Sequence, residues 1–255
     1  MHPAGLCGRA LLPALLLGGV TAAPAAADMT DPPPALDLSA GVTLASDFRL
    51  RGLSLSNRRA SIGATIDASH ISGLHAQLRA ASLSGPAARG ADALVELAAG
   101  YRTMAGPVEL DLGARYFAFA GSTGTTDVIE PYAALGYDIG PVSLSASAHY
   151  APRQRTLAAG TTGRERRADN LYLRAGLDLG VPGTPLTLAA HIGRDTGSGQ
   201  LTLARRYTEW GLGLRHSLGP LTLALDYADS NAGLQLANGR RPGGAGLIAR
   251  ATLDF

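Results

Sequence analysis

Alternation of apolar and polar residues at every second position constrains this chain more than any other feature. From Val142 to Tyr150, apolar side chains alternate with three serines and a histidine. Leu171 to Leu179 alternates in the same way, with polar residues and glycine at the intervening positions. This is the period of a β-strand with two different faces, and no helical stripe competes with it. The sequence therefore predicts an all-β fold.

The same test predicts twelve strands, most of them near the roughly 9 to 11 residues with which a tilted strand crosses a membrane. They are expected at Leu36–Arg51, Ser61–Ser69, Leu74–Ser84, Ala93–Arg102, Val108–Phe119, Val128–Ile139, Val142–Tyr150, Asn170–Leu179, Leu186–Arg194, Tyr207–Leu218, Leu221–Ser230 and Leu247–Phe255. An even number brings both chain ends to the periplasmic side of an antiparallel barrel.

The connections between these strands alternate in length. Five are tight and rich in glycine and proline: His70–Gly73, Thr103–Pro107, Gly140–Pro141, Gly180–Pro185 and Gly219–Pro220. The others are longer: Gly52–Ala60, Gly85–Asp92, Ala120–Asp127, Ala151–Asp169, Asp195–Arg206 and Asn231–Gly246. Short periplasmic turns and long extracellular loops are typical of outer-membrane barrels, whereas a soluble β-sandwich has no reason to alternate in this way. We therefore expect an antiparallel up-and-down transmembrane β-barrel.

The N-terminus carries an export pattern. Basic Arg9 precedes an apolar run from Leu11 to Val20, and small residues follow up to Ala27. The run is too short to span a bilayer, so we expect a cleaved signal peptide over 1–27 and the barrel over 28–255. No later stretch approaches 18 consecutive apolar residues, which excludes a helical membrane protein. Cys7 is the one cysteine, and export without disulfides fits a Gram-negative envelope and an outer-membrane location.

Charge is balanced in total and sorted between the two strand faces. All 22 basic residues are arginines and nearly balance 20 acids, which argues against a nucleic-acid partner. Charged side chains fall on the polar face of the strands, because a face in contact with lipid must be apolar. The polar face is therefore expected to line the lumen. The predicted pore-lining residues are Asp47, Arg49, Arg51, Arg79, Glu96, Glu109, Arg115, Glu130, Arg174, Glu209, Arg215 and Arg250. A lumen of twelve strands is narrow and suits small solutes.

Asp47, Arg49 and Arg51 share one strand face and are expected inside the extracellular mouth, with Phe48 and Leu50 toward lipid. One reading is a charged filter. The other is a clamp, in which the arginines pair with lumen acids, brace the wall and anchor the first loop. We favour the clamp because lumen ion pairs commonly serve structure.

Two further features point to partners. The last strand has one apolar face that ends on Phe255, a form that serves as a signal for the barrel-assembly machinery or simply buries its aromatic ring. The long loops are rich in arginine, at Arg58, Arg59, Arg153, Arg155, Arg164, Arg166, Arg167, Arg205, Arg206, Arg240 and Arg241. Guanidinium groups match phosphate, so these loops either contact lipopolysaccharide and anionic solutes or form a solvated surface.

No catalytic residue, cofactor or metal site is expected. His70 and Ser72 lie two apart, but in a turn that holds a nucleophile poorly against its base. His75, His149 and His191 fall on inward faces without metal-ligand spacing and are expected to be structural or pore-lining. Three functions stay open at this point: a passive channel, a non-conducting scaffold or adhesin, and, least favoured, a lipid-active enzyme.

The segment from Val42 to Ser56, VTLASDFRLRGLSLS, resembles the opening of the TorF-family porins, which carry a similar S-D-aromatic-R-x-R-G-x-S-x-S signature. Weaker similarities follow at Ser72–Leu74, Asp111–Gly113, Tyr116–Phe117 and Glu130-x-Tyr132. The chain departs from the family at Ala64–Thr65, where Gln-Gly is frequent, and at Ser82–Ser84, where Ser-Asn-Val is favoured. The resemblance implies an outer-membrane barrel with a channel role, and we expect passive diffusion of small solutes, anionic ones included.

Overall fold

The computed structural model describes residues 34–122, 126–158, 168–196, 206–236 and 239–255. The expected signal peptide over 1–27 lies outside the described residues. So do Arg164, Arg166, Arg167 and Arg205 of the arginine-rich loops. None of the described helices is long and apolar enough to cross a membrane.

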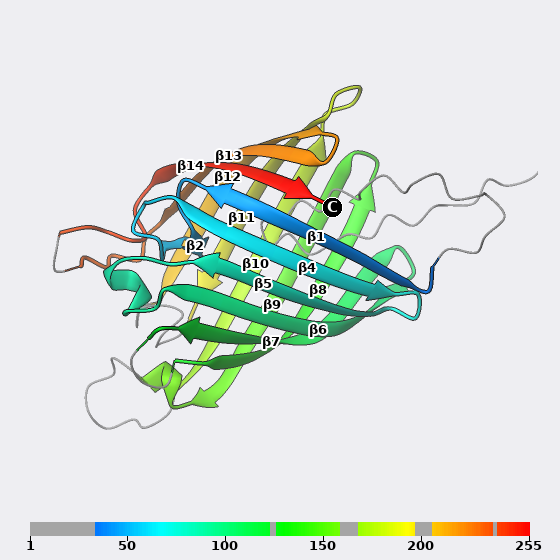
Figure 1. The fold of residues 1–255 in the computed structure, drawn as a ribbon. Coiled ribbons are helices and arrows are strands. Elements are labelled where there is room, and N and C mark those ends of the chain that lie inside the picture. The colour runs from blue at the N-terminus through cyan, green and yellow to red at the C-terminus, as the bar shows by residue number, and fades with distance from the viewer. Residues whose placement is uncertain (1–33, 123–125, 159–167, 197–205, 237–238) are drawn as a thin grey trace, which may run out of the picture.

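Twelve antiparallel strands close into one barrel, which confirms the predicted fold and strand number. In chain order they are β1 Leu36–Ala45, β4 Ser61–His70, β5 Leu74–Ser82, β6 Ala93–Ala105, β7 Val108–Ala120, β8 Val128–Ile139, β9 Val142–Gln154, β10 Ala168–Gly180, β11 Leu186–Asp195, β12 Tyr207–Leu218, β13 Leu221–Ser230 and β14 Gly246–Asp254. The last strand pairs with the first, with Gly41 opposite Asp254, and this pairing closes the wall (Figure 1).

The two ends of the barrel differ. Tight turns gather at one end, the turn end, and long connections at the other, the loop end (Figure 1). Gly106, Gly140 and Gly219 take positive φ angles of 63°, 57° and 61° in the tight turns, which glycine adopts without steric cost. Two short 3₁₀ helices, η1 Pro86–Ala88 and η2 Thr156–Ala158, lie in the long connections. By the usual layout of such barrels, the loop end is extracellular.

The barrel is polar inside and apolar outside. On β8, the Glu130 residue is 0% exposed, whereas the neighbouring Ile129 is 49% exposed. The same inversion runs around the wall, and Leu212 on β12 is 62% exposed. In water this apolar surface would be far larger than a soluble monomer tolerates, so the outer face lies in lipid.

Tyrosines mark the loop end of the outer face. Three outward-facing rings, each exposed by about 36 to 45%, donate a hydroxyl hydrogen bond to a nearby aspartate. The pairs are Tyr116–Asp127 at 2.5 Å, Tyr150–Asp169 at 3.1 Å and Tyr227–Asp229 at 3.3 Å. Aromatic rings with a polar tip are favoured where lipid tails meet headgroups, so this level marks one membrane boundary.

The expected first strand is wrong in its second half. Strand β1 ends at Ala45, and residues 46–60, called loop 1 below, fold into the barrel as a hairpin of β2 Arg49–Leu50 and β3 Leu53–Ser54 (Figure 1). The prediction that Phe48 and Leu50 face lipid is also wrong. Leu50 is 6% exposed, and both side chains pack inside the barrel. A hairpin alternates with the same period as a wall strand, so the pattern continued although the chain had turned inward.

The largest buried apolar cluster lies inside the loop end. Loop 1 contributes Leu50 and Leu55, which pack with residues of the neighbouring connections and the loop-end strand termini. The remaining members are Leu83, Ala87, Ala88, Ala91, Leu94, Phe117, Phe119, Val128, Ala151, Leu157 and Ala168. We call this group the loop-end apolar cluster. Packing in this cluster holds the apolar side chains of loop 1, and the polar side of the hairpin faces the lumen.

Candidate functional site

Loop 1 is organised around the buried carboxylate of Asp47. This group accepts hydrogen bonds from the hydroxyls of Ser54 at 2.6 Å and Ser56 at 2.9 Å, and from Nε of Arg49 at 2.8 Å. The Arg49 guanidinium also donates to the backbone carbonyls of Ala228, at 3.2 Å, and Gly244, at 3.0 Å. Asp47 therefore folds the loop, and Arg49 fastens it to β13 and to the segment just before β14.

Arg51 connects loop 1 to strands on the far side of the lumen. Its guanidinium donates to Glu130 on β8 and, at 3.2 Å, to Asp195 on β11. It also lies 4.4 Å from the ring centre of Tyr172. In the closed strand order, β8 lies almost opposite β1 and β4, the strands that loop 1 connects. Loop 1 therefore spans the interior and narrows it.

The charged form of Arg51 is stabilised by its acidic neighbours. Burial on its own lowers the pKa of this guanidinium, but the nearby charges of Glu130 and Asp195 outweigh burial and raise the pKa above its ordinary value. Side chains of both acids are 0% exposed, and that of Arg51 is 5% exposed. A buried pair of this kind stabilises only while both partners are present.

Further ion pairs continue from this point along the wall. Glu96 on β6 accepts from Arg79 on β5 and lies 3.6 Å from Arg115 on β7. Arg115 lies opposite Glu130 in the β7–β8 register and interacts with it electrostatically, and its guanidinium lies 5.0 Å from the ring centre of Tyr132. We call Arg79, Glu96, Arg115, Glu130, Arg51 and Asp195 the ion-pair belt. It links β5 through β8 to loop 1 and β11.

Glu209 supports loop 1 from the β12 side. Its two carboxylate oxygens accept from the Tyr172 hydroxyl at 2.7 Å and pair with His191 at 2.9 Å. The turn of loop 1 rests against this carboxylate, since a Cβ on Gly52 would lie 2.7 Å from the Glu209 Cβ. Gly52 also has a φ of 75°, which favours glycine. Tyr207 reaches the same turn and donates to the Arg51 carbonyl at 2.9 Å.

The turn-end half of the lumen is more acidic. Arg102 lies 3.2 Å from Glu109 and 3.0 Å from Asp111, which also pairs with His75 at 3.0 Å. Arg215 pairs with Asp178 at 3.2 Å. Within the described part of this half, further inward positions carry Asp67, Asp138 and Asp254. Acids therefore outnumber arginines there.

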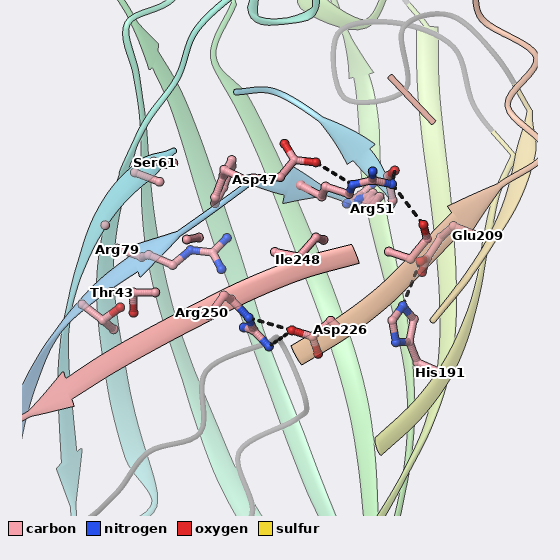
Figure 2. A pocket seen from close by; sticks show the side chains of 18 of the residues that line it. Thr43, Asp47, Arg51, Ser61, Arg79, His191, Glu209, Asp226, Ile248 and Arg250 are labelled. Carbon is pink, nitrogen blue, oxygen red and sulfur yellow. Dashed lines mark hydrogen bonds and ion pairs between the residues drawn. The ribbon is translucent and has the colours of Figure 1, made fainter. Parts of the chain in front are cut away.

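A cavity remains beside loop 1, which we call the under-loop cavity (Figure 2). It has a volume of about 110 Å³ and lies against loop 1, β1, β4, β5, β13 and β14, with residues of β10, β11 and β12 facing them. Arg250 and Asp226 point toward each other at its edge, 2.7 Å apart, and His191 reaches Glu209 at another edge (Figure 2). Arg174 also lines it, and the buried Nε of Arg174 has no hydrogen-bond partner among the described residues.

All predicted pore-lining residues lie on the inner side of the wall or in loop 1. The structure brings Asp47, Arg49, Arg51, Glu130 and Glu209 together around loop 1, whereas Glu109 and Arg215 lie apart at the turn end. Sequence reasoning missed Asp195, Tyr132 and Tyr172. Each lies two positions from a residue on the inward face of its own strand, namely Gly193, Glu130 and Arg174. The alternation of the strands could therefore have placed all three on the inside.

Other predicted residues take simpler roles. His149 is buried between Tyr132 and Tyr172, with ring centres 5.8 Å and 5.9 Å away. His70 lies 2.8 Å from the Ser72 hydroxyl in the exposed turn. In the described ranges, no three His, Cys, Asp or Glu side chains gather closely enough to hold a metal ion. The Phe255 backbone exchanges two hydrogen bonds with Ala40, and its side chain is 57% exposed.

Comparison with a solved porin gives the same architecture. The barrel is similar to the NanC porin, with a TM-score of 0.54 and 14% identity, over 86% of this chain and 99% of that one. It also matches an outer membrane channel from Pseudomonas putida F1 with a TM-score of 0.49 and 14% identity, over 88% and 99% of the two chains. A search of curated proteins finds no match.

The lipid-facing wall and the closed twelve-strand topology are those of a bacterial outer-membrane β-barrel. A family model described as "Bacterial protein of unknown function (Gcw_chp)" matches residues 29–246, and the chain accordingly belongs to the Gcw_chp family.

Proposed function

We propose that this barrel is a narrow porin-like channel through which small solutes diffuse passively, with loop 1 as its constriction. The observation that carries the proposal is the combination of a charged lumen with a solute-sized cavity next to a loop that crosses the interior. Rings of charged side chains at a constriction select solutes by size and field. The clamp formed by Arg51 would set how far loop 1 closes the lumen.

We further propose that anionic solutes are favoured. Five arginines and three carboxylates line the under-loop cavity. Exposed arginines of the long connections, such as Arg58 and Arg240, would attract anions to the loop end before they enter. The acidic turn-end half opposes this preference, so the sign of the selectivity tells which half controls passage.

Single-channel recording in planar bilayers tests both statements. We expect reproducible conductance steps from the wild type and larger steps from Arg51→Ala, because the loop then loses its anchor on the opposite wall. In a salt gradient the reversal potential should shift toward the anion. A cation-selective pore would contradict the anion preference while leaving the channel intact.

One observation favours a second function, a non-conducting envelope scaffold or adhesin. The loop-end apolar cluster and the ion-pair belt occupy much of the loop-end interior. If both the wild type and Arg51→Ala stay silent at every voltage, the scaffold replaces the channel.

The finer predictions from the sequence also stand as proposals. We propose that the chain is a TorF-type porin and that residues 1–27 direct its export. The last strand, ending on Phe255, would be the segment read by the barrel-assembly machinery. The exposed loop arginines would contact lipopolysaccharide phosphates, for which guanidinium groups are suited.

A further inference from the structure

Arg174 stands out among the arginines of the under-loop cavity. The other four each form an ion pair: Arg49 with Asp47, Arg51 with Glu130, Arg79 with Glu96 and Arg250 with Asp226. For Arg174, the described residues supply no hydrogen-bond acceptor to its buried Nε. A buried donor without an acceptor is costly, so this guanidinium is poised for a partner that enters the cavity.

The carboxylates lining the cavity are already engaged. Glu209 interacts electrostatically with Arg174, but its two oxygens are taken by Tyr172 and His191. Asp226 accepts from Arg250, and Asp47 from Arg49 and two serines. A solute carboxylate that enters the cavity would supply the acceptor that the buried Nε of Arg174 lacks.

The rest of the cavity wall is apolar on one side. Phe48 and Ile248 line it together with Ala45 and Ala81. The Arg79 guanidinium lies 6.0 Å from the ring centre of Phe48, which holds the ring within the interior. A volume of about 110 Å³ is of the order needed for a small molecule, since a protein cavity of about 150 Å³ binds benzene.

We propose that the under-loop cavity binds a small organic carboxylate, with its anionic group on Arg174 and its apolar part against Phe48 and Ile248. One guanidinium outside the close ion pairs of the cavity suits a ligand with a single negative charge, and its fork matches the two oxygens of a carboxylate. A phosphate dianion carries more negative charge than one guanidinium balances. It also has no apolar part that could pack against the alanine and phenylalanine side chains of the cavity wall. The site deepens the proposed channel function, because it names the class of solute that would pause beside loop 1.

Binding of benzoate to the full-length barrel refolded in detergent tests the proposal by titration calorimetry. We expect saturable binding at one site, weakened about tenfold or more by Arg174→Gln, as for loss of a charge-assisted hydrogen bond. The benzoate affinity of Arg174→Lys should fall between those of the wild type and Arg174→Gln, since lysine keeps the charge but loses the fork. If Arg174→Gln does not fold, Arg174→Lys takes its place in the test. Phe48→Ala should weaken benzoate and leave acetate unchanged.

The matched control is Arg194→Gln. Arg194 is exposed on the outer face of β11, where it donates to the Thr208 hydroxyl at 2.9 Å, so its removal changes the charge but not the cavity. Equal benzoate binding by wild type and Arg174→Gln would overturn the site, as would equal loss in both glutamine variants. Inorganic phosphate binding as tightly as benzoate would overturn the carboxylate class. Calorimetry needs no conduction, so a silent barrel that binds benzoate rejects the channel and keeps the site.

Discussion

Arg51 and Glu130 form an ion pair between the first loop and the nearly opposite wall of the barrel. The two residues are 79 positions apart in the chain, and Asp195, on the other side of the same guanidinium, is 144 positions from Arg51. One side chain therefore ties three distant segments together. The clamp expected from the sequence describes this contact better than a free charged filter does.

Arg51→Ala should destabilise the barrel by about 3 to 5 kcal/mol, because it removes a buried cation from between two buried carboxylates. Urea unfolding of the protein refolded in detergent micelles, followed by fluorescence of the single Trp210, measures the change. Arg58→Ala is the control, since Arg58 belongs to the same loop but is exposed. Equal stability of the two variants would show that Arg51 does not hold the loop.

Gly52→Ala should be more destabilising than Gly106→Ala. Both glycines have positive φ angles, 75° and 63°, so each substitution incurs about 1 to 2 kcal/mol of backbone strain. At Gly52 the new methyl would also meet Glu209, whereas nothing lies within 4 Å of a Cβ on Gly106. The difference between their unfolding free energies isolates the contact of loop 1 with Glu209, and no difference would mean that the loop moves aside freely.

Leu212→Arg tests the lipid-facing wall. Leu212 lies in the middle of β12 and is 62% exposed, so the charge should cost about 2 to 4 kcal/mol in a bilayer. Leu218→Arg, at the turn end of the same strand, should cost only about 0 to 1 kcal/mol near the interface. Refolding into lipid vesicles measures both. Equal free-energy costs for the two substitutions would argue against a membrane-spanning β12.

Phe117→Ala tests the loop-end apolar cluster. The ring is 1% exposed, and its loss should destabilise the barrel by about 3 to 5 kcal/mol through the cavity it leaves. Leu97→Ala, 51% exposed on the lipid side of β6, should cost less because lipid fills the space. The same unfolding assay compares them, and the reverse order would mean that the cluster is loosely packed.

The wall of the barrel followed from the sequence because lipid and lumen impose a period-two sorting of apolar and polar residues along the wall strands. On β8, the alternation of Ile129 and Glu130 suffices to give both the strand and the direction of each side chain. The tight turns followed as well, since residues such as Gly140 and Gly219 are needed for their backbone.

Loop 1 could not be predicted, because an inward hairpin and a continuing wall strand have the same alternation. What separates them is the hydrogen bonding of Asp47 with Ser54 and Ser56, a contact that sequence periodicity does not encode. The partners of Arg51 were hidden for a related reason. Asp195 ends β11 at the border of a long connection, where strand boundaries are hardest to place.

The hydrogen bonds between Phe255 and Ala40 have a consequence for assembly. They join the last residue of the chain to its first wall strand, so the wall cannot close until every other strand is in place. Loop 1 is made early, directly after β1, yet its anchors on β8 and β11 are made much later. We expect the hairpin to be enclosed as the seam shuts, so that folding of the barrel and narrowing of its lumen are a single event.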